Sequence, residues 1–199
     1  MTATHEILLA SASPRRREIL HNLGYTVQTV AADIDETPRA NETPHDYVLR
    51  LASEKNRAVR AKHFSDDLPI VSADTSVVQH GKILGKPESK IHAAQMLTAL
   101  SGCTHQVLTA VCVSFGEHEY ALVQQNDVQF KILSVDEISA YIATGEPMDK
   151  AGAYGIQGIG GVFVAHLSGS FTGVMGLPVF ETVALLSRCG ANVPPFQAA

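Results

Sequence analysis

Short apolar runs alternate along this chain with segments whose hydrophobic residues recur every three or four positions. The first pattern is typical of buried strands and the second of amphipathic helices. The run at residues 6–10 predicts a strand, and Ser13 as N-cap before Pro14 predicts a helix that ends at Gly24. Further strands are expected over residues 25–31, 105–115, 119–133 and 162–166, and further helices over residues 43–63, 88–100, 134–144 and 179–189. Residues 194–199 are expected to form a frayed tail.

The stretch of residues 70–87 combines an apolar run with reactive side chains. The run ends at Asp74-Thr75, a turn follows at His80-Gly81, and a second run leads back to Lys86. We expect Asp74 at the end of a buried strand and Lys86 on the return arm of a hairpin. Strand ends are rigid supports for reactive groups, and a carboxylate beside a lysine suits a phosphate-bearing substrate. The alternative is a turn or helix cap without chemistry.

The helix that starts at Ser13 carries Arg15, Arg16 and Arg17 in its first turn, directly after Ser11. Free backbone N–H groups at a helix start, with positive side chains beside them, form an anion site by geometry. The segment matches neither a P-loop nor a dinucleotide fingerprint. An exposed arginine-rich helix face remains the alternative interpretation.

Three carboxylates occur within four residues, at Asp33, Asp35 and Glu36. They indicate either a solvated loop or a site for a hard cation such as Mg²⁺. Lys55 follows Leu51 by four positions and so lies on the apolar side of its expected helix. A lysine there either reaches a charged partner or extends its ammonium to solvent.

Residues 152–161 contain five glycines. Such a segment is either a mobile loop or backbone that passes very close to a ligand. The polar residues Asp149, Lys150, Tyr154 and Gln157 in and beside it favour the second interpretation.

The composition narrows the class of protein. A chain of 199 residues fits one domain, or one domain with two lobes. Its 20 Asp and Glu outnumber its 15 Lys and Arg, which argues against a nucleic-acid-binding protein. Three cysteines without CxxC spacing indicate a reducing compartment. No apolar run approaches the ~20 residues that cross a bilayer, and the N-terminal segment has the wrong order for a signal peptide, so we expect a cytoplasmic protein without a membrane partner.

Several segments together resemble one family. They are ASASPRRREIL, LASEKNRAV, SADTSVV with GKILGKP, HAAQMLTALSG with THQVLTAV, and DKAGAYGIQGIGG with GLPVFET. In this order, over about residues 7–187, they resemble the Maf family of nucleoside triphosphate pyrophosphatases. The resemblance implies that residues 1–199 form a single Maf-like α/β domain of the Maf/inosine-triphosphatase-like kind. This fold has an elongated mixed β-sheet flanked by helices, and two lobes with a cleft between them.

The resemblance also implies an activity. Maf proteins hydrolyse a nucleoside triphosphate between the α- and β-phosphates with a divalent cation (Mg²⁺ or Mn²⁺), often as homodimers, and can serve to cleanse nucleotide pools. Thr75 and the segment GAYGIQG point to the branch that acts on dTTP and UTP. The 7-methyl-GTP branch, and a nucleotide-binding regulator that inhibits septum formation, are the alternatives.

Matched position by position, the family assigns roles to ten residues of this chain. Asp74 is the expected proton acceptor, and Lys55 and Lys86 complete the catalytic set. Glu36 and Asp74 are expected to hold the cation. The phosphates are expected at Ser11, Ser13, Arg15 and Arg16, and substrate specificity at Arg15, Thr75 and Gln157.

Overall fold

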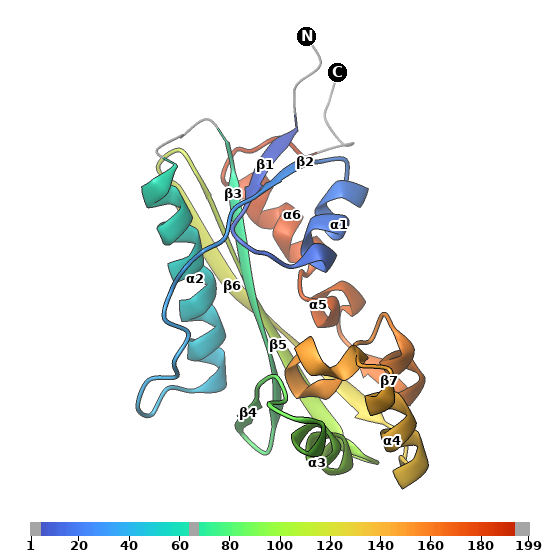
Figure 1. Ribbon diagram of the computed structural model, residues 1–199. Helices are drawn as coiled ribbons and strands as arrows, with labels where there is room; N and C mark the ends of the chain where they lie inside the picture. The colour runs from blue at the N-terminus through green and yellow to red at the C-terminus, as the bar shows by residue number, and fades with distance from the viewer. Residues whose placement is uncertain (1–4, 64–67, 194–199) are drawn as a thin grey trace.

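Two long antiparallel strands, β5 (Thr104–Phe115) and β6 (His118–Phe130), extend through both halves of the molecule (Figure 1). The computed structural model describes residues 5–63 and 68–193. Its seven-stranded mixed sheet has the order β2-β1-β3-β5-β6-β7, and β4 also pairs with β3. The other strands are β1 (Glu6–Leu9), β2 (Thr26–Thr29), β3 (Ile70–Gln79), β4 (Lys82–Leu84) and β7 (Val164–Ser168). The expectation of an elongated mixed sheet flanked by helices is confirmed.

Helices pack against both faces of this sheet. One face is covered by α2 (Pro44–Lys62), which contacts β3 and β5. Figure 1 shows α1 and α6 together at one end of the sheet, and α3 and α4 at the other. The remaining helices are α1 (Pro14–Asn22), α3 (Lys90–Leu100), α4 (Val135–Ala143), α5 (Phe171–Met175) and α6 (Val179–Arg188), with 3₁₀ turns η1 (Glu146–Asp149), η2 (Ala151–Ala153) and η3 (Ile159–Phe163).

Two hydrophobic clusters define two lobes that share the sheet. The first lobe packs α1 and α6 on β1, β3 and β5, and includes Leu9, Leu20 and Leu186. The second packs α3 and α4 against the far ends of β5 and β6, and includes Leu97 and Phe130. Because these apolar groups are separate, a polar cleft can lie between them, as expected.

Strand β3 carries Asp74 and Thr75 at its centre, and the expectation that they end the strand is wrong. On one side β3 pairs with β5 from Ile70 to Val78. On its other side β1 pairs only as far as Val71, and β4 pairs only from Val77 onward. The strand therefore has an open edge between two partners, and Asp74 lies within that opening.

Two smaller expectations also differ from the structure. The strand expected over residues 162–166 begins at Val164, since Ile159–Phe163 form a 3₁₀ turn. The short helix α5 occupies residues 171–175, where no helix was expected, and the side chain of Ser170 accepts the N–H of Gly173. The expected tail at residues 194–199 lies outside the described residues. None of the described helices is long and apolar enough to span a bilayer.

Candidate active site

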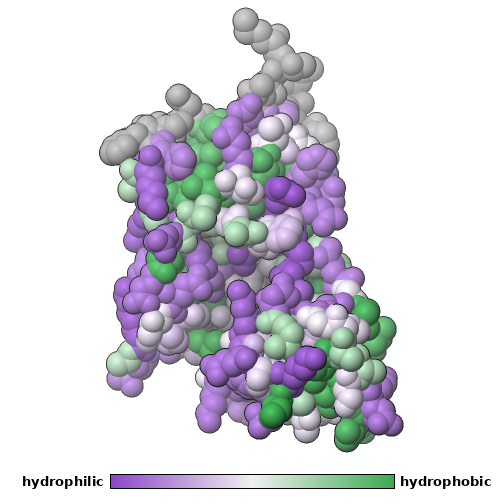
Figure 2. Space-filling model, viewed as in Figure 1, coloured by the Kyte–Doolittle hydropathy of each residue, from purple (hydrophilic) through white to green (hydrophobic). Residues whose placement is uncertain are grey.

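A cleft of about 880 Å³ lies between the two lobes, at the open edge of β3. Figure 2 shows hydrophilic residues gathered around the hollow in the middle of this face. All ten residues expected in the site line the cleft, namely Ser11, Ser13, Arg15, Arg16, Glu36, Lys55, Asp74, Thr75, Lys86 and Gln157. Asp33 and Asp35 are exposed and do not line it. Of the acidic loop, only Glu36 therefore belongs to the site.

Asp74 is held by a lysine from the helix that covers its face of the sheet. Lys55 Nζ lies 2.7 Å from Asp74 Oδ1 and 2.7 Å from Glu36 Oε1. The side chains of Lys55 and Asp74 are each 11% exposed, so Lys55 has a charged partner and does not extend to solvent. Next to Lys55, Asn56 Nδ2 donates to the backbone oxygens of Ile70 (3.0 Å) and Cys112 (3.1 Å), which fixes α2 on the sheet.

The second carboxylate oxygen of Asp74 differs from the first. Oδ1 accepts from Lys55, whereas Oδ2 accepts no hydrogen bond from any residue that the structure describes. Oδ2 also does not belong to the buried side-chain atoms without a partner. It is therefore available from the cleft, where a water molecule can donate to it.

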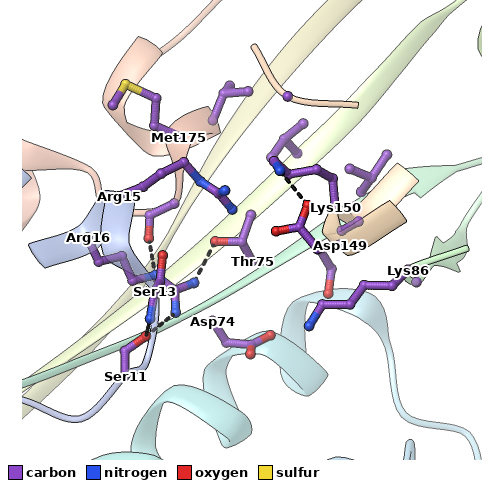
Figure 3. A pocket seen from close by; sticks show the side chains of 18 of the residues that line it. Ser11, Ser13, Arg15, Arg16, Asp74, Thr75, Lys86, Asp149, Lys150 and Met175 are labelled. Carbon is purple, nitrogen blue, oxygen red and sulfur yellow. Dashed lines mark hydrogen bonds and ion pairs between the residues drawn. The ribbon is translucent and has the colours of Figure 1, made fainter. Parts of the chain in front are cut away.

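The three consecutive arginines have three different environments. Arg16 is half-buried: its Nε donates to the Gly176 oxygen (2.7 Å), Nη1 to Ser11 Oγ (3.2 Å) and Nη2 to Thr75 Oγ1 (3.1 Å). Burial lowers the pKa of Arg16, and the negative charge of Asp74 opposes that shift. Arg15 lines the cleft (Figure 3) and makes no hydrogen bond to another described residue, while Arg17 is exposed. The guanidinium of Arg15 can therefore bind an anion in the cleft with all of its N–H groups.

Thr75 belongs to a chain of buried hydroxyl contacts on the other face of β3. Its Oγ1 lies 3.0 Å from Thr109 Oγ1, and Thr109 donates to the Gly173 oxygen (2.8 Å). Gly176, which accepts from Arg16, has a φ of +115°, and a Cβ there would lie 3.5 Å from Thr75 Oγ1. The orientation of Thr75 is therefore fixed by α1, β5 and α5 together.

Lys86 and the glycine-rich segment enter the cleft from the second lobe. Lys86 is exposed and extends in Figure 3 toward the side where Asp74 lies. The preceding Gly85 accepts the N–H of Gly152 (3.0 Å), which ties the two segments together. Lys150 forms an ion pair with Asp149. The positive charges of Lys150 and Arg15 lower the pKa of Asp149.

Tyr47 and Glu146 also line the cleft and had no role assigned from the sequence. The Tyr47 hydroxyl donates a hydrogen bond to the backbone oxygen of Glu36 (2.9 Å) and so anchors the acidic loop on α2. Glu146 lies at the start of η1 and accepts hydrogen bonds from the glycine-rich segment. Tyr47 follows the apolar pattern of its helix and Glu146 follows a helix end, so neither position carried a signal for chemistry.

A divalent cation fits the donor set only in part. Among the described residues, no group of three or more His, Cys, Asp and Glu side chains could hold a metal ion. Glu36 and Asp74 are two carboxylates that approach the same point, which Lys55 Nζ now occupies. Mg²⁺ in phosphate chemistry typically binds one or two carboxylates together with phosphate oxygens. The pair is therefore sufficient for a cation that arrives with a phosphorylated ligand.

The comparisons with known sequences agree with one another. The family model described as Maf-like protein matches residues 6–189. A nucleoside triphosphate pyrophosphatase of Haemophilus ducreyi is 54% identical, over 96% of this chain and 98% of its own length. A dTTP/UTP pyrophosphatase of Pasteurella multocida is 54% identical over 94% and 98%, and one of Neisseria meningitidis 52% over 96% and 97%. A solved structure, the Ham1 protein of Staphylococcus aureus, has a TM-score of 0.45 at 14% identity and covers 63% of this chain and 71% of its own.

Proposed function

This chain belongs to the Maf family, and we propose that it is a nucleoside triphosphate pyrophosphatase that hydrolyses dTTP and UTP to the nucleoside monophosphate and pyrophosphate. The observation that carries the proposal is the position of Asp74. Its carboxylate lies in the sheet opening with Oδ1 held by Lys55 and Oδ2 available, in a cleft that Arg15 and Lys86 also line. A carboxylate among cations suits phosphoryl chemistry, which depends on positioning and charge neutralisation.

The residues of the cleft have different roles in the reaction. Arg15 binds phosphate oxygens with its free guanidinium, and Lys86 adds a point charge. Asp74 Oδ2 accepts a proton from the attacking water, whose oxygen forms a bond to the α-phosphorus while the bond to the bridging oxygen breaks. The pyrophosphate leaves with that bridging oxygen and its electron pair. Lys55 orients Asp74 before the nucleotide binds.

Glu36 and Asp74 are the residues that would hold a divalent cation, Mg²⁺ or Mn²⁺. When bound, the cation supplies neutralisation of phosphate charge and acidification of water. Before the nucleotide binds, Lys55 compensates the charge of the two carboxylates. We therefore propose that a cation binds tightly only together with the nucleotide, whose phosphates restore the negative charge.

Substrate choice is proposed to rest on Arg15, Thr75 and Gln157. Gln157 is exposed at the cleft and offers both an amide donor and a carbonyl acceptor, which suits the polar edge of a pyrimidine. Thr75 is fixed from two sides by Arg16 and Thr109, so its hydroxyl contributes a rigid contact.

The test is an assay of the purified protein with dTTP, UTP or 7-methyl-GTP and Mg²⁺, in which pyrophosphate and orthophosphate are measured separately. We expect pyrophosphate from dTTP and UTP in preference to 7-methyl-GTP. Preference for 7-methyl-GTP would assign the chain to the other branch. Binding of nucleotide without any product would favour the regulatory alternative.

Two further expectations belong to this proposal. The three free cysteines, of which Cys112 and Cys189 are buried, support the cytoplasm, whose thiols are kept reduced, as the place of action. The homodimer expected from the family is tested by sedimentation equilibrium, which should give twice the chain mass.

A further inference from the structure

The glycine-rich segment is held in place by one carboxylate. Glu146 Oε1 accepts the Tyr141 hydroxyl (2.8 Å) and the N–H of Gly160 (3.1 Å), and Oε2 accepts the N–H of Ile159 (2.9 Å). The Tyr141 oxygen in turn accepts the N–H of Gly155 (3.1 Å). The pair Glu146 and Tyr141 therefore binds backbone N–H groups on both sides of Gln157.

Two glycines of this segment, Gly158 and Gly160, lie directly against that pair. A Cβ at Gly158 would lie 2.4 Å from Glu146 Oε2, and one at Gly160 would lie 2.6 Å from the Tyr141 oxygen. Real Cβ atoms do not approach neighbours so closely. At these positions the backbone therefore passes close to side chains of the chain itself, an arrangement that neither interpretation of the sequence described.

Gln157 lies on the turn that is held by Glu146 and Tyr141, a pair that we call the clamp. The N–H of Gly158 donates to the oxygen of Gly155 (3.2 Å), so residues 155–158 form a turn with Gln157 at its third position. Both ends of the turn are anchored, at Gly155 to Tyr141 and at Ile159 to Glu146. The side chain of Gln157 itself has no hydrogen bond to a described residue and lines the cleft.

The chemistry of Glu146 matches this role. An ionised carboxylate accepts several hydrogen bonds at once and donates none, and bonds to a charged acceptor are the strong ones. Burial acts to raise the pKa of Glu146, but the hydrogen bonds from Gly160, Ile159 and Tyr141 outweigh it and leave the pKa below its ordinary value. The clamp therefore stays ionised and intact at neutral pH.

We propose that Glu146, supported by Tyr141, is a positioning residue for substrate specificity: it fixes the turn that presents Gln157 to the nucleobase. This inference rests on the proposed nucleotide substrate. It predicts that loss of the clamp impairs recognition of the base and leaves recognition of the phosphates intact, because Arg15 and Lys86 belong to other segments.

The experiment compares Glu146→Gln with the matched control Glu137→Gln. Glu137 also accepts a backbone N–H, that of Ser134 (2.8 Å), on helix α4 outside the cleft. A glutamine at position 146 has one acceptor oxygen and directs an NH₂ group at N–H donors, so at least one bond is lost. The measurements are kcat/KM for dTTP, UTP and a purine triphosphate, inhibition by inorganic tripolyphosphate, and hydrogen exchange of the peptide that spans residues 155–160.

For Glu146→Gln we expect faster exchange in residues 155–160 and a fall of about tenfold in kcat/KM for the pyrimidine substrates, since small misplacements near a reacting group can cost up to ~10²-fold. Inhibition by tripolyphosphate should change less than about twofold, and Glu137→Gln should leave all three measurements unchanged. Tyr141→Phe should reproduce the exchange effect, and the double variant should lose little more than Glu146→Gln alone.

Three results would overturn the inference. Unchanged exchange with altered base preference would mean that Glu146 contacts the base directly. An equal loss for all bases and for tripolyphosphate would mean a general structural role. Unchanged base preference despite faster exchange would mean that the turn does not select the base. If the wild-type protein hydrolyses no nucleotide, the proposed function fails, while the exchange measurement still tests the clamp.

Discussion

Replacement of Arg16 by lysine should destabilise the fold much more than the same replacement at Arg15 or Arg17. The guanidinium of Arg16 joins three segments, through Ser11, Thr75 and the Gly176 oxygen. The ammonium of a lysine can reach only part of this set, and the acceptors that it leaves are partly buried.

The size of the effect follows from the number of bonds. Loss of two hydrogen bonds from a charged donor, each contributing about 1.5–3 kcal/mol and partly replaced by water, should lower the free energy of unfolding by about 2–4 kcal/mol. For a protein of this length, 1 kcal/mol shifts the melting temperature by about 2–4 °C. We therefore expect Arg16→Lys to melt about 5–15 °C below the wild type.

Thermal unfolding monitored by circular dichroism, with urea titration as a second probe, measures this difference. Arg17→Lys, on the exposed face of the same helix, controls for helix propensity and should melt within about 2 °C of the wild type. Arg15→Lys should also melt normally, but should raise KM because it loses the bidentate contact to phosphate. Equal melting temperatures for the three variants would refute the structural role of Arg16.

Further predictions concern the catalytic residues, the cation and the pH. Asp74→Asn should lower turnover by about 10³-fold or more with nucleotide affinity nearly unchanged, as measured by calorimetry, whereas Asp127→Asn on the exposed part of β6 should do neither. Lys55→Met should raise the affinity for Mn²⁺ in the absence of nucleotide about tenfold, because it removes the ammonium group that lies between the two carboxylates. An electron paramagnetic resonance titration measures this affinity, and an unchanged value would contradict the proposed charge compensation by Lys55. Gln157→Ala should reduce base preference more than turnover with any one base. Burial lowers the pKa of His105 to about 4, so between pH 6.5 and pH 4 this histidine is protonated in the unfolded chain but largely neutral in the folded one. The free energy of unfolding should therefore fall by about 3 kcal/mol over this range. His105→Asn should make it depend less on pH.

Local sequence signals predicted the elements that depend on neighbouring residues. Pro14 does begin α1, and the capping box from Ser134 to Glu137 is present at α4. Ser13 takes the N-cap position of α1, although its side chain caps nothing. These features need only a few consecutive residues, so the sequence was sufficient for them.

Features that depend on distant partners were missed. The sequence showed that Asp74 follows an apolar run, but not that β5 continues to pair with β3 while β1 stops at Val71. The hydrogen bonds of Arg16 include one to Gly176, which is 160 positions along the chain. A lone Glu146 after a helix end gives no sign of the N–H groups that it binds. Local patterns marked all ten residues of the candidate site but left alternatives open, and the resemblance assigned their roles; the fold brings them into one cleft.

Hydrolysis of dTTP in H₂¹⁸O shows which phosphorus atom the water attacks. Attack on the α-phosphorus within this cleft should leave one ¹⁸O atom in the thymidine monophosphate and none in the pyrophosphate, as measured by mass spectrometry. Label in the pyrophosphate would place the attack on the β-phosphorus, and formation of orthophosphate with the diphosphate would place it on the γ-phosphorus. Either result would contradict the roles given to Asp74, Arg15 and Lys86.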